Sequence, residues 1–260
     1  VTLELGGKSP ALIARGSDLA YAAAKVCTGK LANAGQVCMA PDFALVHRSE
    51  QAAFVKEVGA TMRRMYPDLP NNRDFTRVHL PRQRERLAAM VVEASRRDAT
   101  VEVLTGAAID SLAESARFPP VIVQNPPLDT ALMRDEVFGP ILPVIAYDTL
   151  EEAVALLETM SRPLALYFIG GSDAEKDYVL KNTYAGGVTF DDVMLHPFMQ
   201  DLAFGGVGES GMGRYLGYDG FKALSNGKGV VQRPWFDVSK YIAPPYSPGL
   251  VSAMRRALRF

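Results

Sequence analysis

The sequence predicts an α/β layered fold with a largely parallel sheet. Apolar runs of strand length alternate with amphipathic stretches of helix length from residue 10 to residue 190, which is typical of this class. The 260 residues are 48% hydrophobic and 22% charged, a soluble globular composition that is long enough for one large core or two smaller ones. After residue 190 the alternation ends.

The first elements are defined by apolar runs and by capping residues. "PALIA" (10–14) predicts a strand, and Ser17-Asp18 predicts the N-cap of an Ala-rich helix over 19–34 that Gly35 ends. A strand follows at 43–47 ("FALVH"), then a helix at 49–65 and a polar loop at 66–77.

The middle of the chain continues the alternation. A helix is predicted at 79–97, because Leu87, Met90, Val91 and Ala94 fall on one face and the arginines on the other. The remaining predicted strands are 101–104, 121–124, 141–147, 164–170 ("LALYFIG") and 186–190 ("GGVTF"), with helices at 150–160 and 173–182.

The last seventy residues have a different composition. Residues 191–230 are glycine-rich, and 233–249 hold four prolines among aromatic residues, so both predict segments that wrap a domain or reach a neighbour. The final ten residues predict a short amphipathic helix whose basic side is Arg255, Arg256 and Arg259. A surface or docking helix is favoured over membrane association, since the helix is far too short to span a bilayer.

Charge and cysteine content narrow the class of partner. A net charge of −1 and a pI near 6.4 disfavour nucleic acid or an anionic membrane as the main partner. Two cysteines are too few for a disulfide framework, and neither a spanning segment nor a leader is evident, so we expect a cytoplasmic protein. The first residue is Val, which favours a processed product or a fragment.

Three apparent motifs fail on their context. Gly6-Gly7-Lys8-Ser9 resembles the end of a phosphate-binding loop, but Thr2 stands where the first glycine belongs. Gly206, Gly208 and Gly211 form a G-x-G-x-x-G pattern, yet no buried strand precedes it, so a turn that permits close backbone approach is favoured. Around Ser210 the nucleophile-elbow pattern fails at Met212, and the three histidines lack metal-ligand spacing, so no metal site is predicted.

Cys38 is the candidate nucleophile. It lies in "NAGQVCMAPD", three residues after Gly35 and before a strand, where a thiol is open to a ligand. A thiolate suits attack on a carbonyl carbon, but buried structural cysteines are common, and position alone leaves both interpretations open. Cys27, within the Ala-rich helix, is expected to be a core residue.

Two carboxylates are candidates for the accompanying acid-base and binding roles. Glu4 lies between Leu3 and Leu5, and burial there would raise the proton affinity of its carboxyl group toward that of a general base. Glu136 stands near Phe138 in "RDEVFGPILPV". From the residues alone, a solvated charge is the default for both.

Taken together, the motifs resemble the aldehyde dehydrogenase superfamily. "LELGGKSP", "GQVC", "EVFGP" and "FGGVGESGMGR" occur in the family's order, with Cys38 34 positions after Glu4. "NAGQVCMAPD", "RPLALYFIG", "GGVTFDDVMLH" and "YIAPPY" resemble the class 3 and coniferyl-aldehyde dehydrogenase branch. The resemblance extends from residue 1 to about 246. It implies the catalytic half of that fold, with helices on both faces of the sheet and an extended C-terminal tail.

The resemblance implies a role for each site residue. Cys38 would form a thiohemiacetal and then a thioester, with its backbone N–H as half of the oxyanion hole, and Glu4 would activate the hydrolytic water. Glu136 would hold the nicotinamide ribose of NAD or NADP, and Phe138 would pack near the nicotinamide ring. The substrate would be an aromatic or medium to long aliphatic aldehyde, and the protein a homodimer.

The resemblance also implies a division of the chain and a missing half. Residues 1–6 would end the cofactor-binding domain, 7–212 would form the catalytic domain, and 213–260 the wrapping segment and oligomerisation tail. Family members are about twice as long, and their N-terminal half holds most of the cofactor domain and the Asn of the oxyanion hole, so this chain alone is expected to be inactive.

Three positions depart from the branch pattern, namely Asp191, Ala203 and Glu209. They put substrate preference and local loop geometry in doubt, and leave the nucleophile and base untouched. Two alternative functions stay open. One is a non-catalytic assembly module, and the other is a cofactor-independent thiol esterase that uses Cys38 and Glu4.

Overall fold

The structure is a computed structural model that describes residues 1–69, 71–233, 235–237, 239 and 243–258. Contacts divide the chain into two compact units, Val1–Leu224 and Ser225–Phe260. The strands of the first unit are β1 (Leu3–Glu4), β2 (Pro10–Ile13), β3 (Phe43–His47), β4 (Thr100–Val103), β5 (Val121–Gln124), β6 (Ile141–Tyr147), β7 (Ala165–Ile169), β8 (Gly187–Phe190) and β9 (Gly211–Met212). Its α-helices are α1 (Leu19–Leu31), α2 (Gln51–Met65), α3 (Pro81–Ser95), α4 (Ala131–Arg134), α5 (Leu150–Thr159), α6 (Asp173–Asn182) and α7 (Gly217–Ala223).

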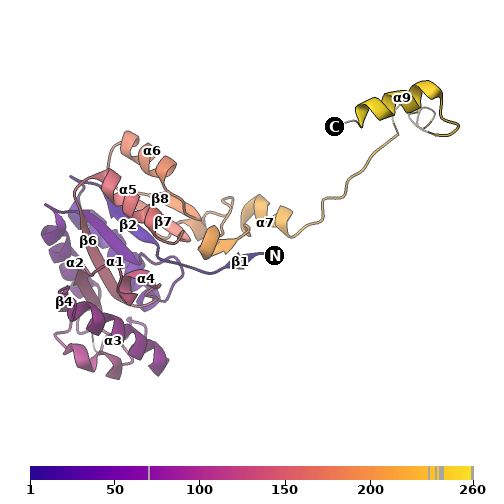
Figure 1. Ribbon diagram of the computed structural model, residues 1–260. Helices are drawn as coiled ribbons and strands as arrows, with labels where there is room; N and C mark the ends of the chain where they lie inside the picture. Colours follow the sequence, from indigo (N-terminus) through magenta and orange to yellow (C-terminus); the bar gives the residue numbers. More distant parts are fainter. Residues whose placement is uncertain (70, 234, 238, 240–242, 259–260) are drawn as a thin grey trace. The chain divides into compact units, whose positions relative to one another are not determined.

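A seven-stranded sheet forms the centre of the first unit (Figure 1). Its strand order is β4-β5-β6-β3-β2-β7-β8, and every neighbouring pair is parallel except β4 with β5. The prediction of a largely parallel α/β sheet is therefore confirmed. The antiparallel strand β4 lies at one edge, where a parallel sheet commonly accepts one.

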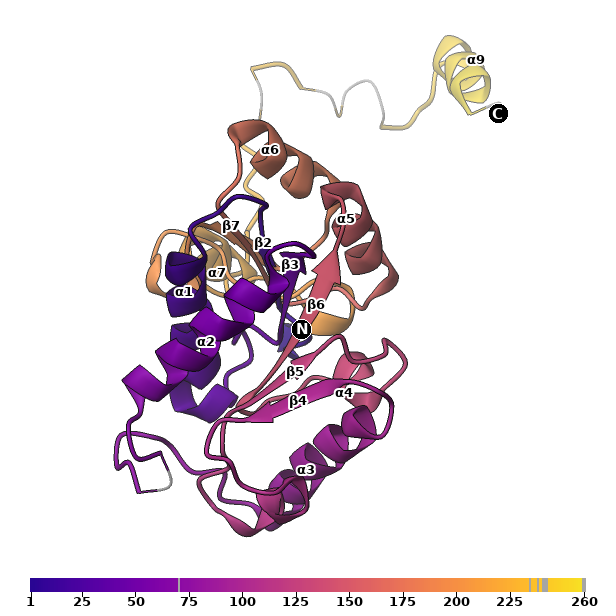
Figure 2. The same cartoon turned by 90° about the vertical axis from the view of Figure 1, so that its left-hand side faces the viewer.

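Helices cover both faces of this sheet, as predicted. Helices α1 and α2 bury their apolar residues against one face, which includes Ala11 and Val144. Helices α5 and α6 pack on the opposite face around Leu12 and Phe168, and α3 covers the same face over β5. Figure 2 shows α1 and α2 side by side in front of the strands. Because strands between two helical layers are buried on both sides, they read in the sequence as continuous apolar runs.

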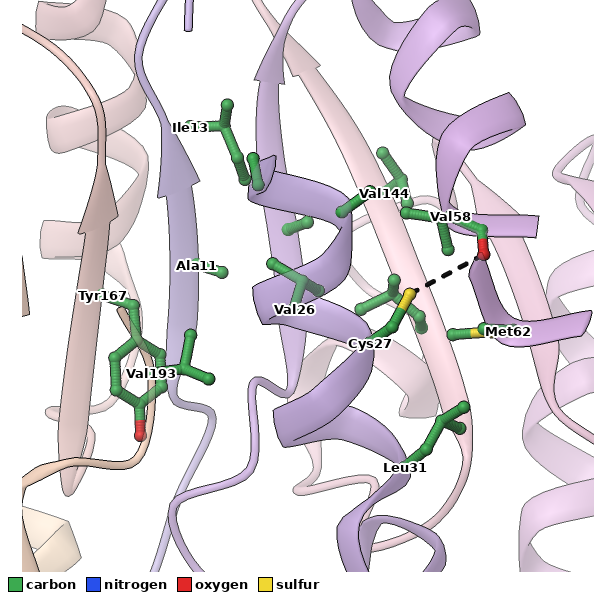
Figure 3. Packing of buried hydrophobic residues seen from close by; sticks show 14 of the residues in the cluster. Ala11, Ile13, Val26, Cys27, Leu31, Val58, Met62, Val144, Tyr167 and Val193 are labelled. Atoms are coloured by element: carbon green, nitrogen blue, oxygen red, sulfur yellow. Dashed lines mark hydrogen bonds between the residues drawn. The ribbon is translucent and has the colours of Figure 1, made fainter. Parts of the chain in front are cut away.

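The contact between α1 and α2 contains Cys27 (Figure 3). Its side chain is fully buried, and its thiol donates a hydrogen bond to the Val58 carbonyl oxygen at 3.7 Å. Burial raises the pKa of the Cys27 thiol to about 12. The prediction that Cys27 is a core residue is confirmed.

Differences from the predicted boundaries have local causes. The helix predicted over 19–34 ends at Leu31, and a 3₁₀ turn at Ala32–Gly35 follows. Asp18 alone is the N-cap, accepting a hydrogen bond from the Tyr21 N–H at 3.0 Å. The sequence pattern missed β1, β9 and α4, since elements of two to four residues leave no periodicity to detect. It also missed α7, whose seven residues include two glycines.

The two missed strands form a small sheet of their own. Strands β1 and β9 pair antiparallel, with Leu3 opposite Met212 and Glu4 opposite Gly211. The Leu5 N–H also donates to the Ser210 carbonyl oxygen at 2.9 Å. This pairing ties the first five residues to the glycine-rich segment about two hundred positions later.

The second unit contains α9 (Pro248–Ala257), which begins three residues before the predicted helix. Ser247 caps it by accepting from the Leu250 N–H at 3.2 Å. Arg255 and Arg256 are exposed, as are Val251, Met254 and Leu258. Arg259 and part of "YIAPPY" lie outside the described residues. Within the described part of the chain, no helix has both the length and the apolar composition needed to cross a membrane.

Candidate active site

A tight reversal after α1 places Cys38. Asn33, Ala34 and Gly35 all have positive φ, at 49°, 53° and 75°. A Cβ added to Gly35 would lie 2.3 Å from the Gly139 carbonyl oxygen, so glycine is required there. The connection that carries Cys38 therefore packs directly against the loop that carries Glu136.

Cys38 itself is half-buried, in contrast to Cys27. The pKa of its thiol is raised to about 12, first by burial and then by the neighbouring Glu4 carboxylate, as hydrogen-bond partner and as negative charge. The charge of Glu136 adds to the shift, while the Cys38 backbone N–H, which favours the thiolate, opposes it. At neutral pH the group is a thiol, and it needs a base to become a nucleophile.

Glu4 is the carboxylate that the structure places beside this thiol. It ends β1 and is exposed, so the burial considered from its apolar neighbours is wrong, and the alternative of a solvated charge at a strand is confirmed. The Tyr215 hydroxyl donates a hydrogen bond to Glu4 Oε2. Glu4 and Cys38 are 34 positions apart in the sequence and lie next to each other in the fold.

The glycine-rich segment holds β1 through close backbone contacts. A Cβ on Gly211 would lie 2.3 Å from the Leu3 carbonyl oxygen, and one on Gly206 would lie 2.1 Å from the Ser210 carbonyl oxygen. The Arg214 guanidinium donates to the carbonyl oxygens of Gly186 and Gly205 at 2.8 and 2.5 Å. The prediction of a turn that permits close backbone approach is confirmed, and the partner approached is the strand of Glu4.

Glu136 lies against the Gly6-Gly7 turn. A Cβ on Gly6 would be 2.8 Å from Glu136 Oε1, so the absent side chain makes room for this carboxylate. Burial raises the pKa of Glu136 to about 7, against a lowering by the Gly7 N–H and by two nearby lysines. The turn therefore joins the Glu4 strand to the Glu136 loop.

Phe138 occupies the exposed part of the same loop. Its φ is 47°, and its ring is 40% exposed. Arg86 fixes the preceding backbone, donating to the carbonyl oxygens of Glu136 and Val137 at 3.1 and 2.5 Å. The loop presents one carboxylate and one aromatic ring, close in sequence and anchored from α3.

A buried charge cluster below this loop was not anticipated from the sequence. Lys8 donates to Asp42 Oδ2 at 2.5 Å and to the carbonyl oxygens of Leu132 and Asp135 at 2.9 and 3.0 Å. Lys30, fully buried, lies 3.7 Å from Asp42 Oδ1, and burial lowers its pKa to about 8. The only sequence signal was charge within apolar surroundings, in "GGKSP" and "MAPDF".

Known proteins resemble this chain over most of its length. The pattern of the aldehyde dehydrogenase family matches residues 1–230. The chain belongs to the aldehyde dehydrogenase family. It is 44% identical over 253 residues to a probable coniferyl aldehyde dehydrogenase of Caulobacter vibrioides, covering 96% of this chain and 52% of that protein. It is 38% identical over 260 residues to the coniferyl aldehyde dehydrogenase of Pseudomonas sp. strain HR199, covering 98% of this chain and 54% of that protein.

Among solved structures too, the chain matches about half of a longer aldehyde dehydrogenase. The substrate-bound Staphylococcus aureus AldH superposes with a TM-score of 0.79 at 28% identity, covering 99% of this chain and 55% of that one. The chain thus spans about half the length of the curated relatives it matches.

The positions that depart from the branch pattern have structural partners here. Asp191, with φ 59°, accepts hydrogen bonds from the Gly170 N–H at 2.8 Å and from Lys176 at 2.5 Å, so it fixes a turn after β8. Glu209 is exposed and lines a cavity of about 300 Å³ with Lys8 and Arg134, whose lining does not include Cys38. Ala203 is half-buried, and nothing in the structure explains its identity.

Side chains of the types that bind metals lie apart in the described part of the chain. Among the described residues, no three His, Cys, Asp or Glu side chains form a group that could hold a metal ion. His196 is buried between Tyr167 and Phe204 and lies 3.2 Å from the Thr189 hydroxyl, as expected of a packing residue.

Proposed function

We propose that this chain supplies the nucleophile and the general base of an NAD(P)-dependent aldehyde dehydrogenase, which oxidises an aromatic or medium to long aliphatic aldehyde to its acid. The observation that carries the proposal is the position of the Glu4 carboxylate beside the Cys38 thiol. The first curated relatives are described as coniferyl aldehyde dehydrogenases, which supports an aromatic aldehyde as substrate.

The chemistry assigned to Cys38 and Glu4 has two parts. In the first, Glu4 accepts the thiol proton as Cys38 Sγ bonds to the carbonyl carbon, and the Cys38 N–H donates to the resulting oxyanion. The thiohemiacetal formed on Cys38 becomes a thioester when a hydride leaves its carbon. Glu4 passes the thiol proton to solvent before the second part. It then takes a proton from water as the water oxygen bonds to the thioester carbon. The C–S bond breaks, and the proton on Glu4 returns to the Cys38 sulfur, so the acid and the free thiol are released.

The cofactor is proposed to meet this chain at Glu136 and Phe138. When bound, a nicotinamide cofactor accepts the hydride. A half-buried carboxylate and an exposed ring, held on an anchored loop, are suited to ribose hydroxyls and to a nicotinamide ring respectively. Ionised Glu136 accepts hydrogen bonds from hydroxyl groups with both oxygens, so its proton must be lost for the tightest contact.

We further propose a cytoplasmic homodimer. Two free thiols, Cys27 and Cys38, are compatible with a reducing compartment. Exposed apolar side chains of the second unit, among them Val230, Val231 and Phe236, are suited to burial against a second copy.

A cofactor-independent thiol esterase is the second candidate for the chain by itself. Both groups that it needs, the Cys38 thiol and the Glu4 carboxylate, lie within these residues. Acylation by an activated ester and hydrolysis of the resulting thioester require no hydride transfer.

Reconstitution tests the dehydrogenase. The 260-residue chain is assayed for NAD(P)H formation with coniferyl aldehyde, alone and after fusion to the N-terminal half of the Caulobacter vibrioides relative. We expect no activity from the chain alone, activity from the fusion, and loss of it in Cys38→Ser, with Cys27→Ser as the matched control. A fusion that folds, binds NAD(P) and leaves the aldehyde unchanged would refute the proposal.

A further inference from the structure

Tyr215 is the side chain that contacts the Glu4 carboxylate. Its hydroxyl donates to Glu4 Oε2, across 211 positions of sequence. Among the described residues, the other side chain within hydrogen-bond reach of this carboxylate is Cys38. Since Glu4 is exposed and ends a strand of two residues, its own packing does not fix the direction of its side chain.

Tyr215 is itself firmly held. Its backbone N–H donates to the Phe204 carbonyl oxygen at 2.9 Å, and its ring meets the Phe204 ring edge-on at a centroid distance of 5.5 Å. Arg214, the preceding residue, anchors the chain to two backbone carbonyl groups. The hydroxyl is therefore a pre-positioned donor at the end of the glycine-rich segment.

We propose that Tyr215 is the positioning residue of the general base, and that its hydroxyl fixes one oxygen of Glu4 so that the other faces the Cys38 sulfur and the hydrolytic water. This inference rests on the proposed function and assigns to the glycine-rich segment a part in it. Strand β9 aligns the backbone of Glu4, and Tyr215, four residues after Gly211, aligns its side chain.

Electrostatic coupling supports the connection. Burial raises the pKa of Tyr215, and the charges of Glu4 and Cys38 raise it further. The same Glu4 charge raises the pKa of Cys38. Tyr215, Glu4 and Cys38 therefore lie close enough that the charge of one group affects the pKa of its neighbour. A protonated hydroxyl is the form that donates to a carboxylate, so Tyr215 acts as a donor throughout the neutral range.

The test uses the 260-residue chain and the reactivity of Cys38. Alkylation by iodoacetamide is followed against pH, and modification is counted on the Cys38 peptide by mass spectrometry, so that Cys27 does not interfere. The variants are Glu4→Gln, Tyr215→Phe and the double variant. Tyr218→Phe is the matched control, because Tyr218 is exposed and stacks on Phe221 in α7.

Glu4→Gln removes a charge that favours the thiol, so Cys38 should alkylate faster at a given pH. Each unit of lowered thiol pKa gives about a threefold faster reaction, because tenfold more thiolate is partly offset by lower nucleophilicity. Tyr215→Phe releases the Glu4 carboxylate to water. It should raise the alkylation rate of Cys38 too, but by less than Glu4→Gln does. The double variant should equal Glu4→Gln, since Tyr215 acts through Glu4.

Hydrolysis of a thioester gives a second readout. After acetylation of Cys38 by p-nitrophenyl acetate, the lifetime of the acetyl group should lengthen about 10²- to 10⁴-fold in Glu4→Gln, the usual range for loss of a general base. Tyr215→Phe should lengthen it at least about tenfold but less than Glu4→Gln does, while Tyr218→Phe should leave it unchanged.

The outcomes distinguish the positioning role of Tyr215 from the general-base role of Glu4. If Glu4→Gln alters both readouts while Tyr215→Phe alters neither, or if the effects of the two substitutions add, Tyr215 does not position the base and the inference fails alone. If Glu4→Gln also leaves Cys38 unchanged, the assignment of Glu4 as general base fails, and the proposed function with it.

Discussion

Replacement of Asp42 by Asn should destabilise the first unit severely. Asp42 accepts from Lys8 Nζ at 2.5 Å and from the Val137 N–H at 3.1 Å, and lies 3.7 Å from Lys30 Nζ. Asn keeps the volume and one oxygen for the Val137 N–H, but it removes the negative charge between two buried ammonium groups.

The expected loss follows from the burial of the cluster. Removing one partner of a buried ion pair costs about 3–5 kcal/mol, because the other charge stays uncompensated. Lys8 keeps two carbonyl acceptors, from Leu132 and Asp135. Lys30 can lose its proton instead. Since its pKa is about 8, this costs about 1.4 kcal/mol near pH 7. We expect the free energy of unfolding to fall by about 3–5 kcal/mol near pH 7.

The loss should depend on pH. The folded-state pKa of Lys30 lies below its ordinary value of 10.5, so the folded state binds fewer protons between about pH 8 and 10.5, and stability rises with pH there. In Asp42→Asn the same rise begins at lower pH, because the charge that raises the pKa of Lys30 is gone. The deficit should therefore shrink by about 1.4 kcal/mol from about pH 7 to about pH 9.

Urea unfolding followed by far-UV circular dichroism measures this. Fluorescence would not, because the single tryptophan, Trp235, is 95% exposed and belongs to the second unit. The control is Asp148→Asn, which breaks an exposed pair with Arg48 and should cost less than about 1 kcal/mol. A loss below about 1 kcal/mol for Asp42→Asn, or a deficit independent of pH, would refute the reasoning.

Three further predictions concern the site. In the reconstituted enzyme, NAD(P) affinity should rise as pH passes upward through about 7, where Glu136 loses its proton, and isothermal titration should show this rise flattened in Glu136→Gln. Gly211→Ala should lower the rate of aldehyde oxidation at least about tenfold, because the new Cβ would lie 2.3 Å from the Leu3 carbonyl oxygen and displace the general base. The control is Gly227→Ala, whose Cβ would meet no atom within 4 Å and should leave the rate unchanged. Equal rates for the two variants would contradict the prediction. In the native chain iodoacetamide should modify Cys27 far more slowly than Cys38, and in urea equally fast, so fast native labelling of Cys27 would argue against its burial.

Most of the sheet could be predicted because its strands are buried on both faces. Runs such as "FALVH" and "LALYFIG" are apolar over strand length and are flanked by glycine or by polar caps, so a buried strand is the one assignment that fits them. The pairing of β1 with β9 could not be predicted in this way. Two-residue strands have no period, and their register depends on glycine contacts that only the folded backbone defines.

Some residues of the candidate site could be predicted from the sequence, and others could not. Cys38 and Glu4 were identified by motif and resemblance, and the structure brings them together; their catalytic roles remain proposals. Tyr215 was missed, because a tyrosine after "GMGR" has no signature of its own. The cluster of Lys8, Lys30 and Asp42 was missed for a related reason. Isolated charges in a sequence are usually solvated. The burial of these three is visible only in the folded chain, where Asp42 lies between Lys8 and the α1 residue Lys30.

The 211 positions between Glu4 and Tyr215 have a consequence for synthesis. At about 5–20 residues per second, a ribosome that has made Glu4 needs about 10 to 40 seconds to reach Tyr215. During that time the nascent chain already displays Cys38, but the strand partner and the hydroxyl group that would orient its base have not yet been translated. A message truncated before the glycine-rich segment would thus yield the Cys38 thiol without an oriented base.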